Sequence, residues 1–153
     1  MKSFTLNTTV GPLAANLYLP ENKENPPVVI VTGAWTTVKE QMPAVYAKVL
    51  ADLGFATLTF DFRGWGKSPD SVKYLEDPVR KTEDIKAVID ALADRDDVDG
   101  SKISVWACAR PRAICLMRPL ATIEYWPSPQ WLPGFITPNW LMRFMVVQKA
   151  FKI

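Results

Sequence analysis

The sequence predicts an α/β fold in which helices cover both faces of a mostly parallel sheet. Short apolar runs of strand length, at residues 28–31 and 55–60, alternate with stretches in which apolar residues recur at helical spacing. A further run begins at Ile103. Strands separated by helices require crossover connections, which make neighbouring strands parallel and pack the helices on the sheet. At 153 residues the chain can bury one core.

The chain opens with two predicted strands, residues 3–9 and 13–19, which are joined by Gly11 and Pro12. We expect these two strands to form a hairpin at the edge of the sheet. A polar loop closed by prolines then leads to the buried strand at 28–31.

Two helices are predicted between the later strands. The first begins near Pro43 and ends at Gly54, and its expected packing face is Val45, Tyr46, Val49, Leu50 and Leu53. The second begins at Asp77, an N-cap residue, with Pro78 as its first helical residue. Its expected packing face is Ile85, Val88, Ile89 and Leu92.

A polar, glycine-containing turn follows the strand at 55–60. Its functional candidates are Asp61, Arg63, Gly64, Gly66 and Ser68. Two glycines so close together allow positive φ and close approach of the backbone. We expect Asp61 and Arg63 to have structural roles, through turn hydrogen bonds and an ion pair that fixes the loop.

Gly66-Lys67-Ser68 is also the end of a phosphate-binding loop motif. The first glycine of that motif is replaced by Asp61, an acid that would repel phosphate. Pro69 follows where the nucleotide-binding helix should run. We therefore disfavour a nucleotide site, and we expect no cofactor and no metal.

Asp-x-Arg-Gly-x-Gly-x-Ser, from Asp61 to Ser68, resembles the turn after the fourth strand of α/β-hydrolases. Residues 28–35 resemble the third strand of that family and its oxyanion loop, and the segment 32–41 resembles the dienelactone-hydrolase-like branch. The resemblance ends near Val105, so it covers the amino-terminal part of a hydrolase sheet. It implies hydrolysis of a small ester or lactone by a Cys or Ser nucleophile. A backbone N–H near Ala34 or Trp35 would stabilise the oxyanion.

The nucleophile of this family lies on a tight turn after the strand that begins at Ile103. Cys108 falls in about the right place and is the candidate nucleophile. Trp106 and Arg110, two residues before and after it, do not fit the small-residue pattern of such a turn. The chain contains no histidine to activate a thiol, which also excludes any histidine-containing metal site.

The character of the sequence changes at about residue 106. Residues 107–153 carry six basic residues against one acid, Glu124, and they are rich in Pro and Trp without sustained periodicity. We therefore divide the chain into a partial hydrolase domain at 1–106 and an irregular tail at 107–153 that is unlike the family. Composition, periodicity and family resemblance agree with one another up to this point and stop agreeing abruptly beyond it, which suggests a frameshift.

The genetic code permits a check of the frameshift hypothesis. The codons allowed for residues 107–117, read one nucleotide earlier, permit Gly-(Met/Leu/Val)-Cys-Ala-Ser-Ala-Gly-Tyr-Met-Ser-Asp. This peptide contains the nucleophile turn that the written sequence lacks. The same shift permits Val-Ala-Pro-Trp-Leu at 131–135 and Leu-Ala-Asn-Ala-Val-Tyr-Gly-Gly at 140–147. Three family-like peptides in one register favour a tail translated out of frame.

Composition limits the classes of partner and function that remain possible. The formal net charge of +2 favours neither nucleic acid nor a membrane surface as a partner, and no apolar run has the length of a membrane span. Two cysteines without a disulfide framework are typical of a cytoplasmic protein. The alternative to a hydrolase remnant is a non-catalytic protein whose Trp-rich tail binds a partner. The sequence predicts no oligomeric state.

Overall fold

The computed structural model describes residues 1–21, 23–107 and 115–117. The strands are β1 (Lys2–Thr8), β2 (Gly11–Tyr18), β3 (Pro27–Thr32), β4 (Ala56–Phe60), β5 (Asp99–Ala107) and β6 (Cys115–Met117). The helices are α1 (Met42–Asp52) and α2 (Pro78–Ala93). The predicted α/β class is confirmed. The irregular tail predicted for 107–153 lies outside the described residues, apart from Ala107 and β6.

The six described strands form one sheet in the order β1-β2-β4-β3-β5-β6. Its centre is parallel, because β3 pairs in parallel with β4 on one side and with β5 on the other. The predicted edge hairpin is present as β1 and β2, but its turn is at residues 9–10, and Gly11 and Pro12 lie in β2. The hairpin joins β4 through an antiparallel pairing of β2. The β5–β6 pairing is also antiparallel. The sheet is therefore mixed at its edges around a parallel core.

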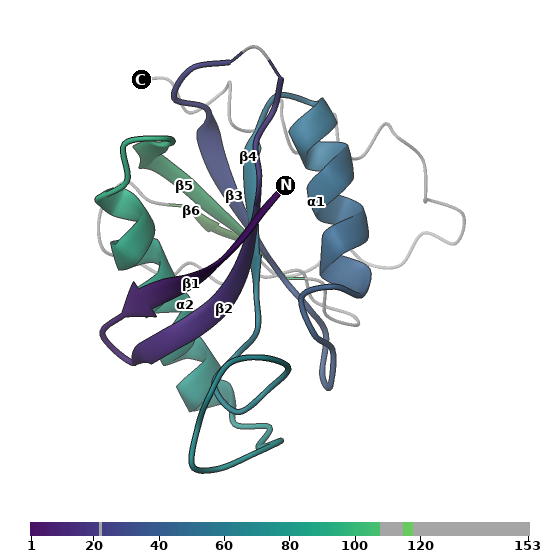
Figure 1. Cartoon of the computed structure of the whole chain (residues 1–153), viewed down its shortest axis with the longest axis vertical. Helices are drawn as coiled ribbons and strands as arrows, with labels where there is room; N and C mark the ends of the chain where they lie inside the picture. The colour runs from purple at the N-terminus through teal and green to yellow at the C-terminus, as the bar shows by residue number, and fades with distance from the viewer. Residues whose placement is uncertain (22, 108–114, 118–153) are drawn as a thin grey trace.

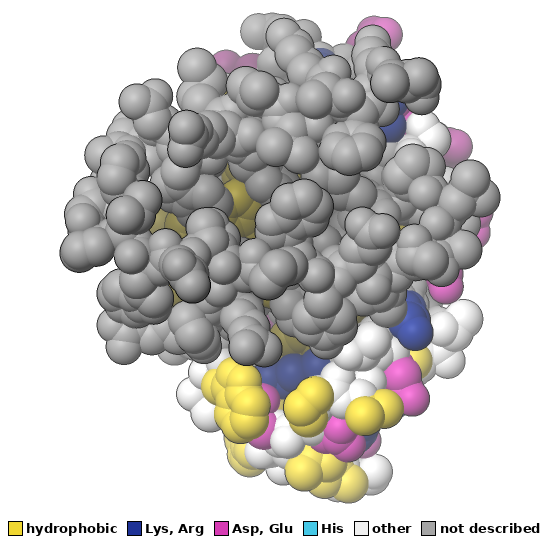
Figure 2. Space-filling model, turned by 180° about the vertical axis from the view of Figure 1, so that it is seen from behind, with side chains coloured by type: hydrophobic (Ala, Val, Ile, Leu, Met, Phe, Trp, Pro, Cys, Tyr) yellow, Lys and Arg dark blue, Asp and Glu magenta, His cyan; other side chains and the backbone are white. Residues whose placement is uncertain are grey.

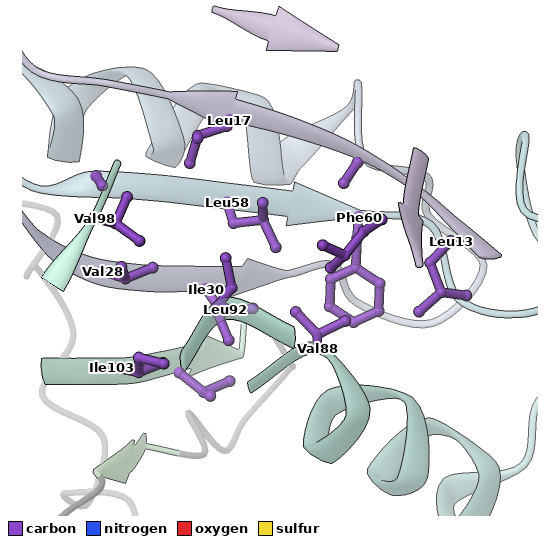
Figure 3. Packing of buried hydrophobic residues seen from close by; sticks show 14 of the residues in the cluster. Leu13, Leu17, Val28, Ile30, Leu58, Phe60, Val88, Leu92, Val98 and Ile103 are labelled. Carbon is purple, nitrogen blue, oxygen red and sulfur yellow. The ribbon is translucent and has the colours of Figure 1, made fainter. Parts of the chain in front are cut away.

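The helices lie on opposite faces of the sheet, as predicted (Figure 1). Alternation along β3 separates the two faces. Val28 and Ile30 belong to the cluster that contains Val88 and Leu92 of α2, as Figure 3 shows. Val29 and Val31 cluster instead with Leu50 of α1.

The packing face predicted for α2 is confirmed. Asp77 caps the helix by accepting hydrogen bonds from the N–H groups of Val79 and Arg80. Val88 and Leu92 are fully buried, and Ile85 and Ile89 pack against the same cluster.

The packing face predicted for α1 is wrong in part. Val45, Val49 and Leu53 are exposed, at 64%, 47% and 44% of their surface. The helix buries Leu50, and Tyr46 packs beside it, as predicted, but the other buried residues are Pro43, Ala44 and Ala47. Small alanine side chains allow the helix backbone to approach the sheet closely, so the larger apolar residues beside them are turned outward. Their spacing correctly indicated a helix but not the face that packs.

Strand β5 continues beyond the point at which the family resemblance ends. Trp106 is buried, and its ring stacks on that of Tyr46 with centroids 6.1 Å apart. Ala107 pairs in register with Thr32 of β3. Both residues therefore fit the sheet, and β5 ends level with the carboxyl end of β3.

Candidate active site

Two loops meet at the carboxyl ends of the central parallel strands. Residues 33–41 connect β3 to α1, and residues 61–77 connect β4 to α2. Both loops lie at the lower end of the molecule in Figure 1. In open α/β sheets ligands bind outside the carboxyl ends of the strands. This end of the sheet is therefore the candidate site.

Asp61 joins the two loops. Its carboxylate is fully buried and accepts hydrogen bonds from the backbone N–H groups of Lys39, at 2.8 Å, and Lys67, at 3.0 Å. The Lys39 ammonium lies 2.6 Å from Asp61 Oδ2 and is itself 3% exposed. It also pairs with the more exposed Glu40. Asp61 thus fixes both the end of one loop and the turn of the other.

The environment of Lys39 raises the pKa of its ammonium group. Burial disfavours the ammonium form, but hydrogen bonds from Nζ to Asp61 and Glu40 more than offset this effect. The net result is a pKa of Lys39 above its ordinary value of 10.5.

We expect this shift to be visible in alkaline unfolding. A raised folded-state pKa stabilises the protein fully below pH 10.5, and that stabilisation is lost as the pH rises through the folded value. Between neutral pH and pH 10.5 the free energy of unfolding should therefore exceed that of Lys39→Met by a constant amount, and the difference should shrink above pH 10.5. A difference that shrinks already near neutral pH would contradict this assignment.

Arg63 anchors the glycine turn to α2. Its Nε lies 2.5 Å from Asp84 Oδ1, its Nη2 lies 2.9 Å from Glu83 Oε2, and its backbone N–H donates to Asp84 Oδ2. Asp84 is 1% exposed. Burial raises the pKa of Asp84, and the contacts with Arg63 offset that effect only in part. Asp61 and Arg63 thus form ion pairs with residues outside the turn and not with each other.

The remaining turn residues shape its backbone. Gly64 and Gly66 have φ of 76° and 51°, the left-handed region that glycine adopts readily. The Ser68 hydroxyl donates to the Asp61 carbonyl at 2.6 Å and accepts from the Ala14 N–H at 2.9 Å. This buried serine therefore ties the turn to β2 and is fully used in structural contacts.

The loop at 33–41 carries the predicted oxyanion residues Ala34 and Trp35. The Ala34 carbonyl accepts from Thr37, from its N–H at 3.4 Å and its hydroxyl at 2.7 Å. Among the described residues, no hydrogen bond is formed by the backbone N–H of Ala34 or of Trp35. The Trp35 side chain is 66% exposed. As far as the described part of the chain goes, these two N–H groups beside the carboxyl end of β3 are therefore unpaired donors.

The other predicted site residue, Cys108, lies outside the described residues. Within 1–21, 23–107 and 115–117, no group of His, Cys, Asp or Glu side chains could hold a metal ion. In the same part of the chain, no helix is long and apolar enough to cross a bilayer.

Sequence reasoning missed two residues of this site, Lys39 and Glu76. Glu76 Oε1 accepts a hydrogen bond from the Thr36 N–H at 2.9 Å. Each residue meets a partner more than 20 positions away, so no local pattern marks the contact. The role of a polar residue that joins two loops can be recognised only in the folded chain.

Solved structures with the same arrangement include proteins described as α/β hydrolases. DcsB, solved in complex with its substrate analogue, is 28% identical with a TM-score of 0.64, and the match covers 69% of this chain and 36% of DcsB. PA2218 of Pseudomonas aeruginosa is 34% identical with a TM-score of 0.63, over 68% of this chain and 33% of that protein. The described residues therefore form the amino-terminal part of an α/β-hydrolase fold.

The chain also has relatives among known sequences. The chain is 36% identical to PA2218 over 95 residues and 36% identical to the uncharacterized protein YcjY of Escherichia coli over 100 residues. It is 42% identical over 55 residues to the hydrolyase poxO of Penicillium oxalicum. These alignments span 61%, 63% and 35% of this chain, but only 26%, 32% and 13% of the relatives. No family model matches the chain. The protein is hydrolase-like, and it aligns with a third or less of each of these sequence relatives.

Proposed function

We propose that this chain derives from a hydrolase that cleaves ester- or lactone-type bonds of a small molecule through a Cys or Ser nucleophile. The observation that carries the proposal is the loop at 33–41. Contacts that include the buried hydrogen bond from Lys39 to Asp61 hold it at the carboxyl edge of the sheet, and within the described residues the N–H groups of Ala34 and Trp35 form no hydrogen bond. The hydrolase structures that share this fold support it.

The chemistry follows from where charge develops. Attack of a nucleophile on an ester carbonyl moves negative charge onto the carbonyl oxygen, and preorganised N–H donors stabilise that charge. The nucleophile itself requires a base. The sequence as written has no histidine and does not continue after β5 with the small residues of a nucleophile turn. We propose that the chain retains the oxyanion half of a site and lacks the nucleophile, acid and base.

We predict that the purified chain hydrolyses p-nitrophenyl acetate no faster than buffer alone. Cys108→Ala should leave this background unchanged, because an unactivated cysteine is a poor catalyst at neutral pH. Initial rates for both proteins, measured over a range of enzyme concentrations, provide the check. Turnover that increases with enzyme and disappears in Cys108→Ala would contradict the proposal.

A second candidate function is partner binding. It is favoured by the apolar residues Val45, Val49 and Leu53, which lie exposed on successive turns of α1. Other exposed apolar side chains, including Trp35 and Tyr74, belong to the two site loops. Figure 2 shows hydrophobic side chains among charged ones at that end of the molecule. A binding module should melt cooperatively and bind little ANS, whereas a remnant that exposes its core should bind ANS strongly.

A further inference from the structure

Glu76 links the segment before α2 to the loop at 33–41. Its Oε1 accepts the Thr36 N–H at 2.9 Å, and its Oε2 lies 2.5 Å from the Lys81 ammonium. The side chains of Glu76 and Lys81 are mostly buried, at 17% and 19% exposed. One oxygen of the Glu76 carboxylate therefore binds the loop at 33–41, and the other binds Lys81 of α2.

Thr36 has a backbone conformation that its own side chain disfavours. Its φ is 61°, in the left-handed region, where β-branched residues are genuine outliers. Strained residues of this kind persist only where their surroundings impose them, and they cluster at functional sites. Among the described residues, the Thr36 N–H donates one hydrogen bond, and its acceptor is the Glu76 carboxylate.

Thr36 directly follows Ala34 and Trp35, whose N–H groups form no hydrogen bond with the residues that the structure describes. Thr37 closes the turn from one side by donating to the Ala34 carbonyl, and Glu76 holds it from the other side through Thr36. We propose that Glu76 is a positioning residue that keeps the N–H groups of Ala34 and Trp35 available to an oxyanion. This role rests on the hydrolase function proposed above.

A carboxylate so close to an oxyanion site would by itself oppose the developing charge. Lys81 compensates for it, because its ammonium pairs with Glu76. The same ammonium lies 4.8 Å from the centroid of the Phe62 ring and 5.6 Å from that of Trp65. These aromatic contacts fix Lys81. Glu76 can thus act as a hydrogen-bond acceptor without adding net charge to the site.

Hydrogen exchange of the Thr36 amide in the full chain tests this role. We compare the wild type with Glu76→Ala, which removes the acceptor, and with Glu76→Gln, which keeps a carbonyl acceptor but loses the charge. In Glu76→Ala the Thr36 amide should exchange about tenfold faster or more. The Ala34 and Trp35 amide resonances should shift as well. Glu76→Gln should restore both readouts toward the wild type.

Amides of β3 and β4 serve as the control for folding and should exchange as in the wild type in every variant. Unchanged Thr36 exchange in Glu76→Ala would overturn the proposal. So would a Glu76→Gln variant that behaves like Glu76→Ala, or faster exchange throughout the sheet, since Glu76 would then support the fold and not the loop. The measurement needs no turnover, so it stands apart from the test of the hydrolase proposal.

Discussion

Replacing Asp61 by alanine is expected to lower the free energy of unfolding by about 3 kcal/mol, because it leaves the buried Lys39 ammonium without its main partner. Lys39 is 3% exposed, and its backbone N–H also loses an acceptor. Removal of one member of a buried pair costs about 3 to 5 kcal/mol. The lower end applies here because Glu40 still contacts the ammonium at 2.8 Å. Urea unfolding at neutral pH measures the difference.

The control for this variant is Asp90→Ala, at an exposed position of α2. Its stability should stay within about 0.5 kcal/mol of the wild type. The double variant Asp61→Ala/Lys39→Met should lose less stability than the sum of the two single changes, because no charge is then left buried. If Asp61→Ala unfolds like Asp90→Ala, the buried pair does not hold the two loops together.

Replacing Gly66 by alanine is expected to disrupt the same contact from the opposite side. An added Cβ would lie 2.3 Å from Asp61 Oδ2 and 2.5 Å from its carboxyl carbon. The carboxylate cannot move aside without losing Lys39 and the Lys67 N–H. The φ of 51° adds the cost of a left-handed alanine, about 1–2 kcal/mol. We expect a total loss of about 3 kcal/mol or more, measured by urea unfolding.

Gly54→Ala separates the steric clash of the added methyl group from the conformational cost of positive φ. Gly54 also has positive φ, at 91°, but an added Cβ there would meet only the flexible Lys23 side chain, at 3.5 Å. This variant should lose about 1–2 kcal/mol, the conformational cost alone. Equal losses at Gly66 and Gly54 would mean that the Asp61 carboxylate adapts to the new methyl group.

Local patterns predicted the strands and the second helix because those patterns report burial directly. The unbroken apolar run at 28–31 becomes the central strand β3, and Asp77 and Pro78 mark the start of α2 as expected. Part of the packing face of α1 escaped prediction because two of its buried residues, Ala44 and Ala47, are small. Large apolar residues dominate a hydrophobic pattern, whereas a helix on a sheet can pack through its smallest side chains.

The chemistry of the site was only partly predictable. The spacing of Asp61, Arg63, Gly64, Gly66 and Ser68 indicated a structured turn, and the structure gives each residue a role in it. The roles of Lys39 and Glu76 depend on two loops meeting across the edge of the sheet, and spacing along the chain carries no such information. Cys108, the candidate nucleophile, lies outside the described residues, so its role remains a prediction.

The sequence changes character close to the end of β5. Trp106 and Ala107 still fit the sheet beside β3, while the charge and the proline content change just beyond them. The solved hydrolases likewise match about 69% of the chain, and the match covers about a third of their own length. We propose that the reading frame changes next to the codon of Trp106. The residues that would complete the site then lie in the alternative frame.

The nucleotide sequence across the codons for residues 105–109, taken from both genomic DNA and transcript, tests this account most directly. If the reading frame has shifted, the frame one nucleotide earlier stays open and encodes a Gly-x-Cys-type turn, followed further on by an acid and a histidine. A stop codon soon after this point in that frame would contradict the account. The Trp-rich tail would then be genuine, and partner binding would become the leading function.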